Sequence, residues 1–231
     1  MNIHTYHHPA RSGETGHTFE MDHLYPSKDP RRQALSKISH ESIPYKHFAD
    51  AIVECLEGNP GRFSGTELWD PPTGWLRDVH FAIAERLGVE DYENLVVMPT
   101  LKTSADVHHG IDLLVAYREP KNDREIIVTV DLSLRRKERF KADVLVTETD
   151  VIPNDWRYAM HETSIPDVPH ANKEEEKQTE QWRRAAIGET IAEIIKQKCR
   201  EEDPRQIATS RGFQARVRSS IAMLLQQKRS A

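Results

Sequence analysis

Two strand-like stretches decide the fold of this chain: His109-Gly110-Ile111-Asp112-Leu113-Leu114-Val115 and Ile126-Ile127-Val128-Thr129-Val130-Asp131-Leu132-Ser133-Leu134. Each stretch carries one aspartate inside an otherwise strand-forming run. An aspartate disfavours a strand, and burying its carboxylate is costly unless the group is paired or binds a metal. Two such aspartates on consecutive strands therefore indicate a site where carboxylates meet a hard cation.

Side chains alternate between the two faces of a strand. One face of the second stretch is wholly apolar and predicts packing against a helix: Ile126, Val128, Val130, Leu132 and Leu134. The other face becomes polar toward its end, as in a strand that leaves the core for a site: Ile127, Thr129, Asp131, Ser133 and Arg135. A polar turn at residues 118–123 favours an antiparallel hairpin, in which Asp112 and Asp131 can be neighbours. The sequence leaves the register of that hairpin open.

The surrounding pattern predicts the α/β class, with a small mixed four-stranded sheet flanked by helices and a C-terminal helical pair. Strands are expected at residues 94–101, 110–117, 125–134 and 142–147. Helices are expected at 44–57, 74–88 and about 172–200, with a last helix within 203–231. In the first helix, Phe48, Ile52, Cys55 and Leu56 share one face.

These elements divide the chain into four expected parts. Residues 1–41 show no sustained periodic spacing of apolar residues and are expected to form a flexible N-terminal arm. Residues 42–152 form the α/β core, and residues 153–171 form a linker marked by Pro153, Pro166 and Pro169. Residues 172–231 form a helical extension, whose part beyond residue 203 is rich in arginine and lysine.

Composition narrows the function classes. A net charge of -5 argues against a wholly basic nucleic-acid coat but leaves room for a local basic patch. Cys55 and Cys199, the two cysteines, lack the spacing of a zinc site and indicate no disulfide framework. No apolar run approaches the roughly 20 residues that span a bilayer, and the first residues do not resemble a signal segment. We therefore expect a cytoplasmic protein without a membrane partner.

The order of elements over residues 70–147 resembles the PD-(D/E)xK nuclease superfamily, which has the restriction-endonuclease-like fold. That order is a helix, a strand, a strand with an Asp, and a strand ending in an acid-x-Lys triplet. By this resemblance Asp112 is the first acid and Asp131-Leu132-Ser133 stands at the triplet. The family's two acids bind a divalent metal, here Mg²⁺ or Mn²⁺, and its lysine assists the attacking water. A glutamate that many members carry on the preceding helix is matched by Glu85 or Asp78.

One position departs from the family pattern, because Ser133 stands where the lysine is expected. A serine cannot supply a positive charge, although its hydroxyl can hydrogen-bond a water on the metal. Arg135, one strand step farther on the same face, or Lys137 can reach back to stabilise the phosphate or to orient water. Without such a residue, the site binds without cutting.

A basic segment follows Asp131 directly. Its five cations are candidate contacts to nucleic-acid phosphates, and the alternative is an ordinary solvated hairpin turn: Arg135, Arg136, Lys137, Arg139 and Lys141. His108 and His109 precede Asp112 and are groups that support the metal ligands, a general base or part of a polar loop. The tetrapeptide Glu20-Met21-Asp22-His23 resembles the Asp-His of HNH nucleases, but the further Asn and His do not follow at usable spacing.

Two functions of different classes follow. The first is a metal-dependent nuclease that hydrolyses phosphodiester bonds of DNA, or a degenerate relative that still binds nucleic acid. The alternative is a noncatalytic adaptor whose C-terminal helices form a homodimer, which the missing lysine and the acidic net charge favour. Stabilisation by a divalent ion separates the two, because only a real metal site links binding to folding.

Overall fold

The computed structural model describes residues 16–25, 27–57, 74–88, 94–121, 124–147, 150–154, 163–164, 173–200 and 219. The helices are α1 (Gly16–Leu24), α2 (Pro30–Ser36), the 3-10 helix η1 (His40–Ser42), α3 (Phe48–Leu56), α4 (Gly74–Leu87), α5 (Ser104–His109) and α6 (Lys173–Arg200). The strands are β1 (Leu95–Pro99), β2 (Leu113–Glu119), β3 (Arg124–Leu132), β4 (Val144–Val146), β5 (Asp150–Pro153) and β6 (Thr163–Ser164).

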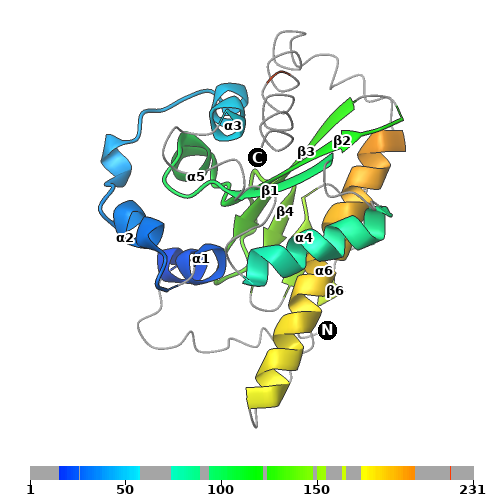
Figure 1. Ribbon diagram of the computed structural model, residues 1–231. Coiled ribbons are helices and arrows are strands. Elements are labelled where there is room, and N and C mark those ends of the chain that lie inside the picture. Colours follow the sequence, from blue (N-terminus) through cyan, green and yellow to red (C-terminus); the bar gives the residue numbers. More distant parts are fainter. Residues whose placement is uncertain are drawn as a thin grey trace.

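The strands form one mixed sheet in the order β1-β2-β3-β4-β5-β6 (Figure 1). Strands β1, β2 and β3 are antiparallel neighbours, and the pairing of β2 with β3 is the hairpin that the polar turn between the two aspartate-bearing stretches predicts. Strand β4 then lies parallel to β3, and β5 and β6 continue the sheet in antiparallel pairs. The basic segment after β3 is therefore a crossover between parallel strands and not the hairpin turn of the alternative interpretation.

The predicted α/β class with a mixed sheet is confirmed, but the number of strands is wrong. All four predicted strands are present, and the sheet gains β5 and the two-residue β6 at its edge. Strand β5 has only four residues, beginning with Asp150 and ending with Pro153, both of which are poor strand formers. Its pairing with β4 comes from its neighbours, which a local pattern does not contain.

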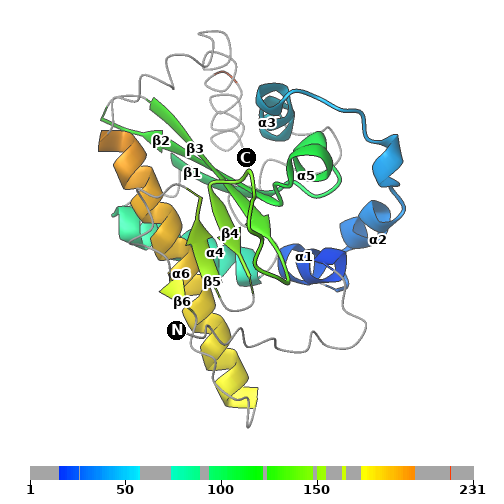
Figure 2. The ribbon, with the colours of Figure 1, turned by 180° about the vertical axis from the view of Figure 1, so that it is seen from behind.

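Helices cover both faces of the sheet (Figures 1 and 2). On one face, α1, α4 and α6 pack on the apolar side of β3, and this core includes Ile83, Ile126, Val130 and Ile191. On the other face, α3 and α5 pack against β1 and β2. The predicted division of β3 into an apolar face and a face with a polar end is thus confirmed.

The predicted apolar face of α3 is only partly buried. Ile52, Cys55 and Leu56 lie in the core, whereas Phe48 is exposed at the first residue of the helix. A residue in the first turn of a helix can project beyond the layer that the later turns cover. The helical period alone does not distinguish these positions.

The described part of the segment expected as a flexible arm contains the α-helices α1 and α2 and the start of η1. Helix α1 packs against α4 and β3, and Phe19, Met21, Leu24 and Tyr25 are buried in the core. Helix α2 begins at Pro30 after Asp29, whose side chain accepts a hydrogen bond from the backbone N–H of Arg31. Both helices are too short to show a sustained period in the sequence, so tertiary packing and capping decide them.

Helices α4 and α6 approach closely at one point. A Cβ on Gly188 of α6 would lie 2.3 Å from the Cβ of Ala82 of α4. Glycine is needed there because any larger side chain would force the two helices apart. This contact fixes how α6 lies along α4 over the sheet.

The predicted long C-terminal helix is confirmed as α6. Residues 201–231, apart from Ser219, lie outside the described residues, as does most of the predicted linker at 153–171. Strand β6 falls within that linker and pairs with β5. Among the described helices, none is both long enough and apolar enough to cross a membrane.

Candidate active site

Asp112 and Asp131 lie side by side. Leu113 of β2 pairs with Val130 of β3, which sets Asp112, the residue before β2, opposite Asp131. The backbone N–H of Asp112 donates to the Val130 carbonyl at 2.8 Å and so extends the ladder by one step. Both aspartates are buried. The neighbourhood expected from the hairpin is therefore present.

The end of α5 places Asp112 at this edge. Gly110 ends the helix in the left-handed region, with a φ of 64° that favours glycine. A Cβ on Gly110 would come within 3.9 Å of the Asp131 carboxylate. Beyond the turn, the Asp112 carboxylate accepts a hydrogen bond from the Leu132 N–H at 2.7 Å. That bond ties the side chain to β3, the strand that carries Asp131.

Lys137 supplies the cation that Ser133 cannot. Its ammonium donates to both carboxylate oxygens of Asp131, each at 2.8 Å. The Ser133 hydroxyl instead accepts a bond from the Arg135 N–H at 3.4 Å, and the Arg135 side chain is exposed. Of the two basic residues expected to reach back, Lys137 contacts the acid.

Glu20 of α1 is a further acid that acts on this site. The pKa of Glu20 is raised to about 7, mainly by burial and also by the charges of Asp106 and Asp131, against the opposing charges of Lys137 and Lys102. The sequence signal for Glu20 is slight, because α1 shows no clear period and the Glu20–His23 tetrapeptide suggests a different nuclease family. Its role depends on α1 docking against the sheet, which is a tertiary contact.

Asp106 of α5 is a second acid that sequence reasoning missed. It lies in the first turn of α5, and its carboxylate accepts a bond from the Lys102 N–H at 2.6 Å. An aspartate near a helix N-terminus is usual for capping alone. Nothing in the local pattern therefore distinguishes it from an ordinary capping residue.

Neighbouring carboxylates raise the pKa of Asp112 and of Glu20. Burial raises the pKa of Asp112 well above its ordinary value, and the charges of Glu20, Asp106 and Asp131 raise it further. Burial also raises the pKa of Asp131, against the opposing effect of Lys137. A buried group of like charges of this kind favours taking up either protons or a cation.

Lys102 lies next to these acids in an unusual backbone conformation. It is buried, and its φ of 61° is the one positive value among the described non-glycine residues. A non-glycine residue in this region costs about 1–2 kcal/mol. Its charge lowers the pKa of Glu20, which shows that the ammonium acts on the same site.

The structure does not bring Glu85 or Asp78 to Asp112. Glu85 is exposed on α4, and Asp78 forms an ion pair with Arg184 of α6. Helix α4 presents its apolar face to the sheet, so these acidic positions fall on its outer side. The glutamate whose charge acts on Asp112 is Glu20.

His108 and His109 hold a loop in place. The Nε2 atom of His108 donates to the Ile43 carbonyl, and that of His109 donates to the Lys46 carbonyl, both at 2.9 Å. Their ring nitrogens are thus used to fasten the segment before α3. Both histidines lie at the end of helix α5 and not in a polar loop, and these two bonds give their rings a structural role.

The donors brought together here suit a hard cation. Among the described residues, no three His, Cys, Asp or Glu side chains form a group that could hold a metal ion. Mg²⁺, however, is commonly held by one or two carboxylates and completes its shell with water. Asp112 and Asp131 fit such an ion chemically, and Asp131 would then be shared between the ion and Lys137.

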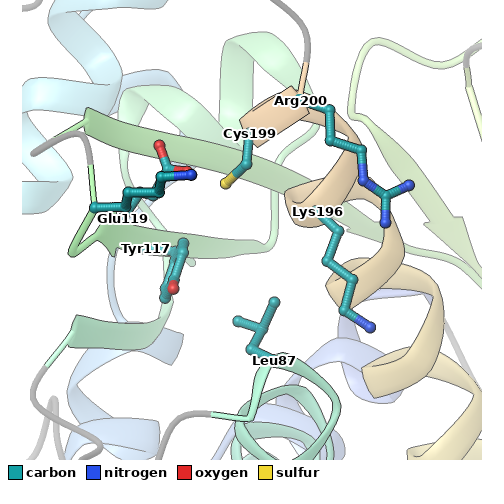
Figure 3. A pocket seen from close by; sticks show the side chains of 7 residues that line it. Leu87, Tyr117, Glu119, Lys196, Cys199 and Arg200 are labelled. Atoms are coloured by element: carbon teal, nitrogen blue, oxygen red, sulfur yellow. The ribbon is translucent and has the colours of Figure 1, made fainter.

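A pocket of about 380 Å³ lies far from these acids, at the other end of β2 (Figure 3). Tyr117 and Glu119 of β2 face Lys196, Cys199 and Arg200 of α6 across it. Burial raises the pKa of the Cys199 thiol, so this cysteine is not an activated nucleophile. None of the predicted site residues lines this pocket.

The arrangement therefore combines a buried carboxylate pair, a lysine on one of its members and a glutamate that can exchange a proton near neutral pH. Comparisons with models of protein families, with curated proteins and with solved structures found no match. The chemistry of these side chains is thus the basis on which the function is inferred.

Proposed function

We propose that this chain is a metal-dependent phosphodiesterase that acts on DNA, with a restriction-endonuclease-like core. The observation that carries the proposal is the contact of Lys137 with Asp131 beside the buried Asp112. It combines two acids and a lysine in space although the sequence lacks the lysine of the acid-x-Lys triplet. The order of α4, β1, β2 and β3, with the short helix α5 between β1 and β2, supports the same assignment.

Asp112 and Asp131 would hold Mg²⁺ or Mn²⁺ through their carboxylate oxygens. When bound, such an ion activates water and offsets charge on a phosphoryl group. The ammonium of Lys137 then lies where it can hydrogen-bond the attacking water or a phosphate oxygen. Glu20, with a pKa of about 7, can accept a proton from water at neutral pH.

The basic crossover between β3 and β4 provides contacts for the substrate backbone. Five cations occur within seven residues of it, and their side chains are exposed: Arg135, Arg136, Lys137, Arg139 and Lys141. Contacts of this kind position a nucleic-acid backbone without reading its sequence. Because Lys137 belongs to the same segment, a backbone bound here lies close to the carboxylate pair.

The test combines melting curves with a cleavage assay on wild type, Asp112→Asn and Asp131→Asn. We expect Mn²⁺ to raise the melting temperature of wild type and to leave both variants nearly unchanged. Plasmid and linear DNA should be cut in Mg²⁺ or Mn²⁺, but not in EDTA, with losses of at least about a hundredfold in both variants.

Glu85→Gln is the matched control, because Glu85 is an exposed carboxylate on α4. It should keep both the metal-dependent shift and the cleavage activity. Cleavage that persists in Asp131→Asn would remove that residue from the mechanism. No metal-dependent shift in wild type would contradict the metal site itself.

A homodimeric adaptor is the second candidate. The observation that favours it is the exposure of Phe81 on α4 and Trp182 on α6, two large apolar side chains on helices that pack together. Sedimentation of wild type and of Phe81→Ser/Trp182→Ser tests it. A dimer that dissociates in this double variant, together with indifference to Mn²⁺, would favour the adaptor.

A further inference from the structure

Near α3 and α5, the exposed rings of Tyr45, His47 and Phe48 lie against the half-buried His108 and the buried His109. Tyr45 is 62% exposed and Phe48 is 44% exposed. The Tyr45 ring lies 5.5 Å from that of His108 and 5.7 Å from that of His47, and the Phe48 ring lies 5.6 Å from that of His109. We call these five residues the ring cluster. Single exposed aromatics are ordinary, but a contiguous group of rings marks a binding surface.

The backbone that carries Tyr45 is fastened to α5. The N–H of Lys46 donates to the Ser104 hydroxyl at 2.9 Å, and the carbonyl of Lys46 accepts from His109 at 2.9 Å. The carbonyl of Ile43 accepts from His108 at the same distance. Three hydrogen bonds thus fix the chain around Tyr45 while its ring stays open to solvent. A ring presented in this way loses little conformational entropy when a ligand stacks on it.

The ring cluster adjoins the basic crossover. The ammonium of Lys141, an exposed residue of that crossover, donates to the His108 carbonyl at 3.3 Å. Helix α5 then leads through Gly110 to Asp112. Rings, cations and the acidic site therefore follow one another along one part of the molecule.

From this juxtaposition we propose that the ring cluster is a stacking platform for unpaired bases of a single-stranded nucleic acid. Bases stack on Tyr45 and Phe48 while the backbone phosphates contact Lys141 and its neighbours. Sites for single strands combine a cationic track with exposed aromatic side chains in this way. Bases inside a duplex are already stacked on one another and cannot use the platform. The inference rests on the proposed function, because it names the form of nucleic acid that this site would receive.

The test measures binding by fluorescence anisotropy in EDTA, where a metal-dependent enzyme does not cut. The probes are a fluorescein-labelled oligothymidylate and the blunt duplex that it forms with oligodeoxyadenylate. The proteins are wild type, Tyr45→Ala, Phe48→Ala, Tyr45→Phe and Phe81→Ala. Phe81 is the matched control, because it is 45% exposed but lies on α4.

We expect each alanine variant in the ring cluster to weaken binding of the single strand roughly fivefold to a hundredfold, the range that one base stacked on one aromatic side chain contributes. Tyr45→Phe, which keeps the ring, and Phe81→Ala should bind like wild type. Affinity for the duplex should stay the same in every variant.

Three results would overturn the platform. The first is that wild type does not bind the single strand. The second is that Tyr45→Ala and Phe48→Ala lose no more affinity than Phe81→Ala. The third is that these variants lose as much affinity for the duplex as for the single strand. Asp131→Asn in the same assay separates this inference from the proposed function. If that variant binds the single strand like wild type and wild type does not cleave DNA, the proposed phosphodiesterase activity is contradicted and the stacking platform still stands.

Discussion

Lys137 donates to both carboxylate oxygens of Asp131, although it lies six residues farther along the chain. The lysine therefore comes from the crossover after β3 and not from the strand itself. Its side chain is 43% exposed, whereas that of Asp131 is buried. A lysine on an exposed segment can move away from the acid more easily than one held in a strand. In the proposed enzyme, Lys137 and a metal ion would therefore compete for the same carboxylate.

Replacing Lys137 tests this competition. We expect Lys137→Ala to bind Mn²⁺ more tightly than wild type, because Asp131 no longer shares its oxygens with an ammonium. The same variant should cleave DNA about a hundredfold or more slowly, since it lacks the cation that assists water and phosphate. Calorimetric titration of Mn²⁺ and a cleavage time course measure the two effects. Arg135→Ala, which removes an exposed cation of the same crossover, is the control and should change neither by more than a few-fold.

Glu20 should make stability depend on pH in the metal-free protein. Its pKa rises from 4.5 to about 7 on folding. The contribution of Glu20 to the free energy of unfolding is therefore complete below about pH 4.5 and is lost as the pH rises through about 7. In this interval the folded state holds a proton that the unfolded chain has released, so a rising pH favours unfolding. Glu20→Gln stays neutral and should avoid this loss. Melting temperatures in EDTA should thus favour the variant increasingly above pH 4.5.

Glu138→Gln, which changes an exposed carboxylate of the basic crossover, is the control for that series. It should follow the wild-type curve. A difference between Glu20→Gln and wild type that stays constant across the pH range would contradict the raised pKa of Glu20.

Gly110 and Gly88 form a matched pair. Both have a positive φ, 64° and 66°, and each follows the C-terminus of a helix. Alanine at either position should lower the free energy of unfolding by about 1–2 kcal/mol, because a Cβ is strained in this region. Only Gly110→Ala should also reduce cleavage, since Gly110 turns the chain toward Asp112. Denaturant unfolding and the DNA assay measure the two effects, and equal activity of both variants would contradict the positioning role.

The close approach of α4 and α6 predicts a larger change in stability. Gly188→Ala would place a Cβ 2.3 Å from that of Ala82, so the helices must separate. We expect a loss of about 1–3 kcal/mol, as for other overpacked cores. Gly74→Ala, where a new Cβ meets nothing within 4 Å, should be neutral or slightly stabilising. Thermal unfolding of both proteins checks the contrast, and Ala82→Gly should partly rescue the first.

The acidic pair could be predicted because its causes are local. Alternation along β3 and one polar turn suffice to bring Asp112 and Asp131 together, and both are within reach of a short pattern. The choice of Lys137 over Arg135 could not be predicted, because it depends on the path of the crossover to the parallel strand β4. The sequence offered both residues and contained no information on that path.

The role of Glu20 and the edge strands β5 and β6 could not be predicted for a different reason. Helix α1 is short, and its place is determined by Phe19 and Leu24 packing on α4 and β3. Strands β5 and β6 likewise depend on the neighbours that they pair with. Hydrophobic periods and turn signals describe one segment by itself. Helix α1 and strands β5 and β6 instead depend on contacts with other parts of the fold.

The positions of Asp112, Asp131 and Glu20 along the chain have a consequence for folding kinetics. Asp112 and Leu132, joined by a hydrogen bond, are only 20 residues apart, so the carboxylate pair comes with a hairpin whose loop is short. Glu20 reaches the pair only when α1, from the other end of the described core, docks on β3. Contacts between distant parts of a chain carry the larger loop-closure entropy and tend to form later. We therefore expect the nascent hairpin to carry its two carboxylates before Glu20 arrives, so that the proton-exchanging group is the last part of the site to assemble.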